Sequence, residues 1–299
     1  MRICTFNVKN EQAPKWRAGI VENDEVVEIE GRPAIMDLLI RHGELDQVRA
    51  SGPRHDFTKV EFHAPIPRPG KIVAAIVNTR GMLGGDDVLL TRPRLDMKAP
   101  STVIGPDTDV CSPPSGIRPE VELAAVIGAV VSRATPEEAR RSIFGYTILN
   151  DVTSPSDSRD DAYEAYRRDP KSKRIAKRSM RGPLFRSKNH DTFCPMGPWI
   201  TTEDAIGHAN RLRMSTRFDG MFVQEGNTAE YLFSPEEVAS YVSGFLTLEP
   251  GDVISCGSVG WTPQALGDLD PTEFVLPLRD GILDLQIDGI GRLRNPVLI

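Results

Sequence analysis

Two neighbouring apolar runs predict buried strands at the centre of the fold. Residues 121–131 read VELAAVIGAVV, and residues 143–151 read IFGYTILND and end on Asp151. Nearly unbroken apolar runs of this kind are typical of strands that are buried on both faces. Glu120 and Glu122 are two residues apart, so on an extended strand their side chains leave the same face. We therefore expect both glutamates at the mouth of a core strand.

The first 65 residues predict a small α/β unit, with residues 66–299 as the main domain. Three prolines between positions 65 and 69 favour a stiff, extended linker at this boundary. Within the small unit the pattern predicts strands in 2–8, 17–24 and 26–31, a hairpin turn at 22–25 and an amphipathic helix over 33–43.

The main domain alternates strands with short helices. KIVAAIVN at 71–78 predicts a buried strand, and the loop that follows, 79–87, carries three glycines and suits a mobile cover over a site. Further predicted features are helices capped by Thr135 with Glu138 and by Ser234 with Glu237, a hairpin turning at Asp219-Gly220, and a strand pair turning at Asp288-Gly289.

The stretch from Ser154 to Lys188 is highly charged and poor in aliphatic residues. Such a run usually forms a solvated face, so we predict a surface helix or a mobile loop in its middle. Its basic half, 171–186, lies between two candidate site segments, which leaves a role toward an anionic substrate or at an interface open.

Composition excludes several classes of function. The chain has 299 residues and a net charge of -6, which argues against a nucleic-acid partner. No apolar run is long enough for a membrane span, and the N-terminus lacks the pattern of a secretory signal, so we expect a cytoplasmic protein. The four cysteines are widely separated and form no CxxC pair, so reduced, buried thiols are expected rather than a zinc site.

The acidic residues at the strand ends are candidate metal ligands. Glu120, Glu122 and Asp151 would gather three carboxylates, and hard divalent cations such as Mg²⁺ prefer oxygen ligands. From spacing alone, the two glutamates could equally be surface residues that flank a strand, and Asp151 a turn or cap residue.

Several sequence strings, taken together, resolve these alternatives. VELAAVIG, FGYTILNDVT, KNHDTFCPMGPW, QEGNTAEYLF, LTLEPGDVISCG and IDGIGRLRNPV follow one another between residues 118 and 299. In this order they closely resemble the fumarylacetoacetate hydrolase family, and PIPRPGKIVAAIVN resembles the start of its catalytic domain. The resemblance implies an α+β, mostly β fold: a mixed β-sandwich roll catalytic domain, here preceded by the small α/β domain, in a protein that forms homodimers.

The resemblance also implies roles for individual residues. Glu120, Glu122 and Asp151 match the family's ligands for Mg²⁺ or Mn²⁺, and Lys188 matches a lysine that contacts the substrate. Gly257 and Ser258 match a glycine and a hydroxyl residue that form part of the site. Family substrates are small 2-oxo acids or diketo acids that chelate the metal, which stabilises an enolate.

The sequence departs from the family at other positions. Met82 and Gly85 stand where the hydrolases carry the histidine and glutamate that activate water, and Pro155 and Ser158 replace an arginine and a glutamine. The family's GTP reads GSV here. The sequence thus keeps the family's metal ligands and its lysine. It lacks the histidine and glutamate that activate water, and the arginine and glutamine that contact the substrate.

Three explanations of these departures stay open. Neighbouring residues can supply the missing groups: Asp86 or Asp87 in the loop, His190 beside Lys188, and Arg80 or Arg159 as cations. The protein can instead run chemistry that needs only the metal and a lysine, as a 2-oxo acid decarboxylase, isomerase or lyase. It can also be a non-catalytic homologue that binds a metabolite.

We predict the first case, a metal-dependent hydrolysis of an acylpyruvate-type carbon–carbon bond. Lys188, His190 and Asp86 are the predicted catalytic residues. Arg80, Gly257 and Ser258 are predicted to bind the substrate.

Overall fold

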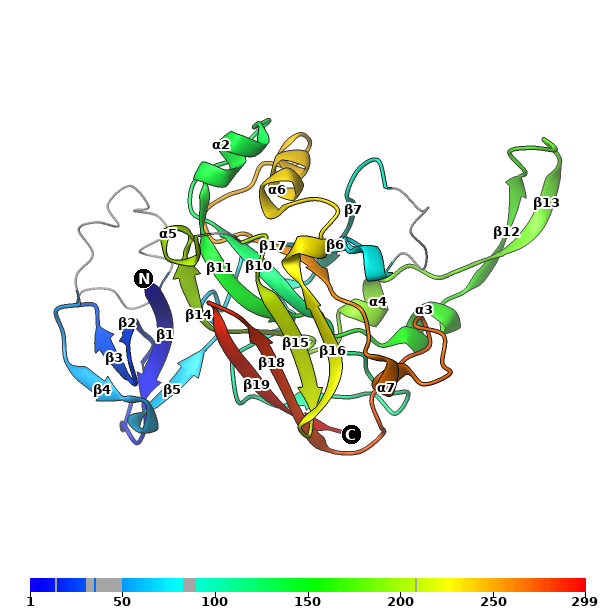
Figure 1. The fold of residues 1–299 in the computed structure, drawn as a ribbon. Coiled ribbons are helices and arrows are strands. Elements are labelled where there is room, and N and C mark those ends of the chain that lie inside the picture. Colours follow the sequence, from blue (N-terminus) through cyan, green and yellow to red (C-terminus); the bar gives the residue numbers. More distant parts are fainter. Residues whose placement is uncertain (14, 31–34, 36–49, 83–89, 208) are drawn as a thin grey trace.

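The fold is that of a computed structural model, which describes residues 1–13, 15–30, 35, 50–82, 90–207 and 209–299. The helix predicted over 33–43 and the predicted catalytic Asp86 lie outside the described residues. The prediction of a mostly β, α+β protein is confirmed: strands dominate and the helices are short (Figure 1). Within the described ranges, none of the helices has both the length and the apolar character needed to cross a membrane.

A large twisted sheet forms the main layer, in the order β4-β3-β2-β1-β14-β11-β10-β17-β6-β7, with β5 beside β1 and β8 beside β14. The two predicted core strands, β10 (Val121–Ile127) and β11 (Ile143–Asn150), are antiparallel neighbours at its centre. The other strands of this sheet are β1 (Arg2–Val8), β2 (Arg17–Glu22), β3 (Glu25–Glu28), β4 (Arg54–Asp56), β5 (Val60–His63), β6 (Ile72–Ile76), β7 (Arg94–Lys98), β8 (Val103–Ile104), β14 (Cys194–Thr202) and β17 (Val253–Ser258).

A second sheet packs on one face of this layer. Its strands, in spatial order, are β16 (Met221–Asn227), β15 (Arg213–Phe218), β18 (Gly281–Ile287), β19 (Gly291–Leu298) and β9 (Val110–Cys111). Val121, Leu123 and Ala125 of β10 join Met214 and Leu285 of the second sheet in one buried core. This sandwich explains why β10 reads as an unbroken apolar run, since its other side chains are buried on the opposite face.

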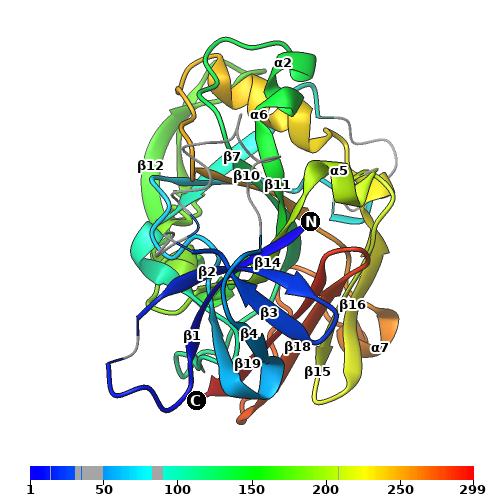
Figure 2. The same cartoon turned by 90° about the vertical axis from the view of Figure 1, so that its left-hand side faces the viewer.

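Side chains on the opposite face of β10 lie in a second core, which they share with the N-terminal strands of the same curved sheet. Ala124 and Val126 of β10 share a core with Ile3 and Ile20. Strand β1 pairs with β14, so the N-terminal strands extend the large sheet without a break (Figure 2). The boundary between residues 65 and 66 stays a prediction. Glu122 alternates with Val121 and Leu123, and therefore lies on this second face.

The helices begin where the sequence places their caps. In α2 (Pro136–Arg141), Thr135 and Glu138 form the predicted capping box, and α6 (Pro235–Ser243) begins in the same way at Ser234. The predicted hairpin turn is confirmed, because Asp219 and Gly220 both have positive φ. The remaining helices are α3 (Pro155–Asp160), α4 (Phe185–Lys188), α5 (Glu203–Ile206) and α7 (Pro263–Leu266).

The prediction for the middle of residues 154–188 is wrong. This segment is neither a helix nor a loop but a hairpin of β12 (Tyr163–Arg168) and β13 (Ile175–Met180). Its turn is built by Asp169, whose carboxylate accepts hydrogen bonds from the backbone of Lys171 and Ser172. Asp169-Pro170 is a turn signal that also blocks a helix, and the charge of the segment obscured it.

Candidate metal centre and active site

Three carboxylates meet where the two central strands begin and end. Because β10 and β11 are antiparallel, with Val121 opposite Asn150, Glu120 and Glu122 at the start of one strand lie beside Asp151 after the end of the other. One oxygen from each carboxylate lies within 4.8 Å of the others, and all three residues are buried. Asn150 fixes this corner, since its side-chain oxygen accepts from the backbone N–H of Glu120 at 3.0 Å.

Lys188 bridges two of the carboxylates, those of Glu120 and Asp151. Its Nζ donates to Glu120 Oε2 and to Thr153 Oγ1, each at 3.1 Å, and to Asp151 Oδ2. Burial alone would lower the pKa of this lysine, but the Asp151 and Glu120 carboxylates outweigh burial and raise it. Lys188 therefore stays an ammonium group that donates hydrogen bonds to these carboxylates.

Lys98 is a second cation at the site, and it is fully buried at the end of β7. Its Nζ donates to Asp151 Oδ1 at 2.7 Å and to the carbonyl oxygens of Lys188 at 2.7 Å and Val152 at 3.2 Å. Burial would raise the pKa of Asp151, but the two ammonium groups outweigh burial and lower it to about 2. Asp151 is therefore ionised at every physiological pH.

Arg118 is the third cation and contacts Glu120. Its guanidinium NH2 lies 3.1 Å from Glu120 Oε1, and the group also faces the ring of Trp261 at 5.9 Å from the ring centroid. Trp261 in turn stacks on Phe274 at 4.5 Å. Among the described residues, the buried Nε of Arg118 and Nε1 of Trp261 have no hydrogen-bond partner. Two donors at the edge of the carboxylate cluster are thus available to an anionic ligand.

Within the described part of the chain, the groups that donate hydrogen bonds to Glu122 are neutral. Ser255 Oγ donates to its Oε2 at 2.5 Å and the backbone N–H of Gly257 donates to the same oxygen at 3.0 Å. Burial, reinforced by the charges of Asp151 and Glu120, raises the pKa of Glu122 to about 8. Burial disfavours the charged form of this carboxylate, and a divalent cation bound to it would stabilise that charged form.

Comparisons with known proteins identify the family of this chain. Residues 84–298 match the family model described as fumarylacetoacetate (FAA) hydrolase C-terminal. The chain belongs to the fumarylacetoacetate hydrolase family. It is 27% identical over 308 residues to a 2,4-didehydro-3-deoxy-L-rhamnonate hydrolase of Sphingomonas sp. (strain SKA58), with 99% of this chain and 96% of the relative covered.

Two further relatives show how widely the reactions of the fumarylacetoacetate hydrolase family vary. An oxaloacetate tautomerase of Bacillus subtilis (strain 168) is 34% identical over 252 residues, which covers 81% of this chain and 75% of that protein. The solved fumarylacetoacetate hydrolase of psychrophilic Exiguobacterium antarcticum superimposes with a TM-score of 0.79 at 28% identity, with 99% of both chains covered. The relatives are enzymes, and they include both hydrolases and tautomerases.

Gly257 and Ser258, which the sequence predicts to bind the substrate, lie against Glu122. Gly257 has a φ of +101°, and a Cβ there would lie 2.7 Å from the Cβ of Asn78, so the position requires glycine. Ser258 Oγ accepts from Nε2 of the buried Gln224 at 2.9 Å, and the Gln224 side chain also receives the backbone N–H of Val121. This glutamine therefore ties the serine to the strand of the glutamates.

His190 lies outside the carboxylate cluster. Its Nε2 is 2.6 Å from Oδ2 of Asp157 in α3, and Asp157 also accepts from Arg186 in α4 at 2.8 Å. Ser158 accepts a hydrogen bond from Arg181 Nε at 3.0 Å. Helices α3 and α4 thus form a polar wall, which we call the α3–α4 wall, and Lys188 is the last residue of α4.

The glycine-bearing segment predicted as a loop over residues 79–87 begins beside Ser258 and Gly260. Thr79 Oγ1 donates to the carbonyl of Ser258 at 2.8 Å, and Gly81 lies next to Gly260. Arg80, between them, is exposed, and in the described parts of the chain no hydrogen bond joins it to the three carboxylates. The structure thus places the start of the loop at the site without bringing the Arg80 side chain to the cluster.

Sequence reasoning missed Lys98, Arg118 and Thr153. Arg118 and Thr153 each stand two residues from a predicted ligand, Glu120 and Asp151, and on extended chain such residues share a face. That spacing could have found both of them. Lys98 has no such signal, because only the pairing of β7 with β6 brings it to the site.

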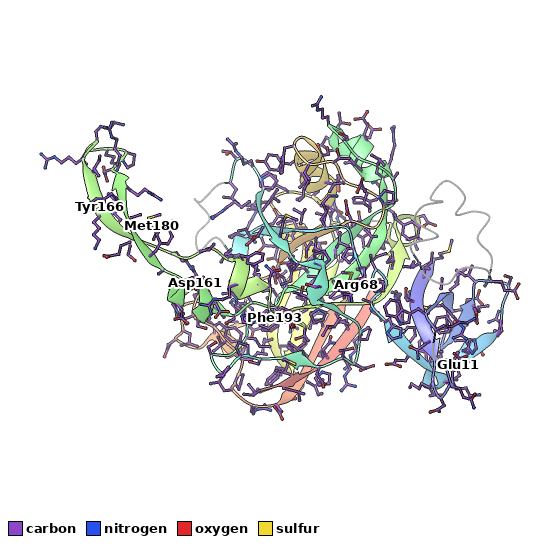
Figure 3. The ribbon with its side chains drawn as sticks, turned by 180° about the vertical axis from the view of Figure 1, so that it is seen from behind. Glu11, Arg68, Asp161, Tyr166, Met180 and Phe193 are labelled. Carbon is purple, nitrogen blue, oxygen red and sulfur yellow. The ribbon has the colours of Figure 1, made fainter. Side chains whose placement is uncertain are left out.

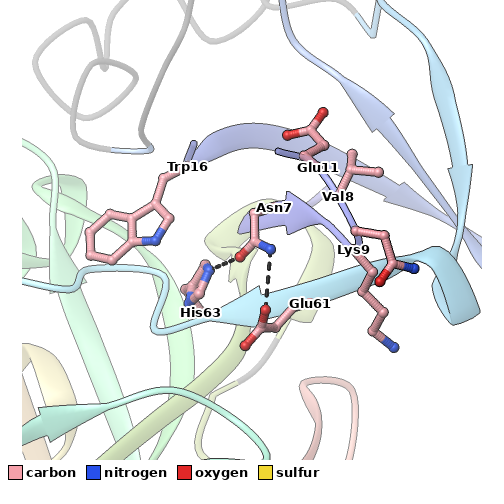
Figure 4. A pocket seen from close by; sticks show the side chains of 8 residues that line it. Asn7, Val8, Lys9, Glu11, Trp16, Glu61 and His63 are labelled. Carbon is pink, nitrogen blue, oxygen red and sulfur yellow. Dashed lines mark hydrogen bonds between the residues drawn. The ribbon is translucent and has the colours of Figure 1, made fainter. Parts of the chain in front are cut away.

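A pocket of about 500 Å³ lies elsewhere, on the N-terminal strands (Figure 4). Trp16 and His63 line it with their rings 5.1 Å apart, and Asn7 bonds both His63 and Glu61. None of the three candidate metal ligands lines this pocket, so it is separate from the site.

Proposed function

We propose that the protein is a metal-dependent enzyme that acts on a small 2-oxo acid or 1,3-dicarbonyl compound through an enolate, by acylpyruvate-type hydrolysis of a carbon–carbon bond. The observation that carries the proposal is the buried cluster of Glu120, Glu122 and Asp151 with its cations. The family relation supports enzyme activity of this general kind, and the choice of reaction and substrate is our proposal.

The cluster fits a divalent cation. Its donors are carboxylate oxygens, which Mg²⁺ and Mn²⁺ favour, and their separations of up to 4.8 Å suit atoms around one ion. We propose Glu120, Glu122 and Asp151 as the ligands. A bound divalent ion would supply Lewis-acid polarisation of the substrate carbonyl.

The residues around the cluster suit an anionic substrate. The three carboxylates are matched in number by Lys98, Lys188 and Arg118, so a divalent ion would leave an excess of two positive charges in a buried site. A 2-oxo acid with a second negative group would neutralise this excess. We propose that Arg118 and Trp261 receive its carboxylate. We also propose Gly257, Ser258 and Arg80 as substrate-binding residues.

Lys188 and His190 are the proposed proton-handling groups. The ammonium group of Lys188 is already among the carboxylates, where it can donate to the oxygen on which enolate charge develops. His190 is oriented by Asp157, an arrangement typical of an acid–base histidine. We also propose Asp86 as a catalytic residue, because the sequence places it in the glycine-bearing loop predicted beside the site.

A tautomerase, or another reaction that needs no activated water, is the alternative. Met82 occupies the position of the hydrolases' histidine, and a tautomerase is 34% identical to this chain. Decarboxylation and lyase reactions pass through the same enolate. A non-catalytic homologue is less well supported, because the ligands and the lysine are all present and in contact.

Two measurements test the proposal. Calorimetric titration with Mn²⁺ is expected to show one site that Glu122→Ala weakens at least tenfold. The exposed Glu137→Ala in α2 serves as the matched control, since Glu137 forms a surface ion pair with Arg141, away from the three carboxylates. Unchanged affinity in Glu122→Ala would overturn the metal site.

An assay panel then tests the reaction. Acylpyruvates, oxaloacetate and ring-cleavage oxo acids are incubated with the Mn²⁺-loaded protein, and pyruvate release is separated from ketonisation by absorbance. Pyruvate release supports the hydrolase, and ketonisation alone supports the tautomerase. If the whole panel is silent, the proposal of enolate chemistry fails.

A further inference from the structure

The pocket of about 500 Å³ on the N-terminal strands has no part in the proposed reaction. Its volume is in the range of sites that hold small molecules. Figure 3 shows Glu11, one of its lining residues, at one end of the molecule, far from Asp161 at the end of α3. The pocket is therefore a separate candidate binding site.

The alternation of side chains along β5 builds a polar wall of this pocket. Glu61 and His63 are two residues apart, so their side chains share one face of the strand, while Phe62 between them points to the other. On that other face the ring of Phe62 packs edge-on against Trp199, with their centroids 6.0 Å apart. Asn7 of β1 lies opposite Glu61 in the antiparallel register. The fold thus turns polar side chains of two neighbouring strands toward the pocket (Figure 4).

A chain of hydrogen bonds fixes which atoms of these side chains remain available to a ligand. The amide nitrogen of Asn7, which is only 5% exposed, donates to Glu61 Oε2 at 3.1 Å. The amide oxygen of Asn7 therefore faces His63 and accepts a hydrogen bond from Nε2 of that ring. Burial lowers the pKa of His63, so the ring is neutral near neutral pH and its Nδ1 is an acceptor. Among the described residues, no donor is bonded to this Nδ1.

Glu61 carries the uncompensated negative charge of the pocket. Its side chain is exposed, and within the described ranges of the chain it forms no ion pair. The other lining carboxylate, Glu11, is neutralised by Arg17, whose two terminal nitrogens donate to its oxygens at 2.9 and 2.7 Å. Lys9 also lines the pocket, but its Nζ donates to the carbonyl of Thr58 at 3.1 Å, and Figure 4 shows its side chain apart from Glu61. The charge of Glu61 is thus available to a cationic ligand.

Trp16 adds an aromatic surface to the carboxylate and the imidazole. It lies just before β2 and is 45% exposed, and its ring centroid is 5.1 Å from that of His63. The face of an indole ring attracts cations, more strongly than the face of any other side chain. Amidinium and guanidinium groups are planar, cationic and rich in N–H donors, so one such group can bond a carboxylate and stack on a ring. The three features of the pocket therefore favour the same class of ligand.

We propose that this pocket binds a small planar organic cation of the amidinium or guanidinium class, with its N–H groups on Glu61 and His63 and its face against Trp16. A ligand bound in this way would join β1, β5 and the segment before β2. The inference concerns a site apart from the three buried carboxylates, and it does not depend on which reaction they support.

Benzamidine is the probe that tests this proposal, because benzamide and benzoate have nearly the same shape but carry a neutral and a negative group. Ligand-observed NMR titration of the full chain, with Mn²⁺ present, is expected to show benzamidinium binding with a Kd below about 10 mM. Benzamide should bind at least tenfold more weakly, and benzoate should not bind at this pocket. Absence of benzamidinium binding, or equal binding of benzamide, would overturn the proposal.

Variants show whether the cation binds in this pocket. Glu61→Gln keeps the shape of the side chain and removes its charge, and it is expected to weaken benzamidinium binding at least tenfold. Trp16→Leu should weaken the same binding several-fold. Glu137→Gln, which removes an exposed charge in α2, is the matched control and should leave binding unchanged. Circular dichroism shows that each variant is folded, and benzamidinium binding that persists unchanged in Glu61→Gln would place the cation elsewhere and refute the inference.

Discussion

Removing the buried ammonium group of Lys98 should strongly destabilise the metal-free protein. The substitution Lys98→Met keeps the length of the side chain and removes its charge. Lys98 is fully buried, and its Nζ donates to Asp151 Oδ1 and to the carbonyls of Val152 and Lys188. All three acceptors would lose a donor that water cannot replace without opening the site.

The magnitude follows from these contacts. Breaking a buried ion pair by removing one partner costs about 3–5 kcal/mol, because a charge is left buried and only partly compensated. Lys188 still contacts Asp151, which favours the lower end of that range, and the two stranded carbonyls add about 1 kcal/mol each. A loss of about 5 kcal/mol corresponds to a fall of more than 1 M in the urea midpoint, at an m-value of about 3 kcal/mol per M.

Urea unfolding in EDTA, followed by tryptophan fluorescence, measures this loss. The control is Arg141→Met, which removes a cation from an exposed pair with Glu137 and should cost about 0–1 kcal/mol. A loss in Lys98→Met no larger than that of the control would refute the claim that Lys98 stabilises the buried carboxylate.

Two further predictions concern titratable groups. The pKa of Glu122 is raised to about 8, so its unfavourable ionisation should reduce the folding stability of the metal-free protein as pH rises from about 4.5 toward 8. Wild type should therefore lose stability relative to Glu122→Gln over that range in EDTA, and a constant difference would contradict this. Burial raises the pKa of Cys194 to about 12 and also raises the pKa values of Cys4 and Cys256, whereas Cys111 is exposed. Ellman's reagent should therefore react with one thiol in the native protein and with four after denaturation, and Cys111→Ser should abolish the native reaction.

Features with a local cause could be predicted from sequence. The capping box at Thr135 depends on residues three apart, and the Asp219-Gly220 turn on two residues that tolerate positive φ. The hairpin of β12 and β13 also has a local cause, the Asp169-Pro170 turn, but the high charge of the segment is equally typical of a solvated helix or loop.

Some features of the candidate site could likewise be predicted from the sequence, whereas others depend on the fold. The positions of Glu120 and Glu122 on one strand face follow from the period of a strand, and the family strings marked Asp151 and Lys188. The pairing of His190 with Asp157 and the burial of Lys98 could not be read from the chain, since each depends on segments that the fold brings together.

By itself, the sequence determined the family, the mostly β fold and the three carboxylates, because strand periodicity and ordered motifs are properties of the chain. Only the tertiary structure decided which charges surround those carboxylates. Lys98 reaches Asp151 from 53 residues away and Lys188 reaches Glu120 from 68 residues away. The electrostatic balance of a buried site is a sum over non-local neighbours, and strand pairing selects those neighbours.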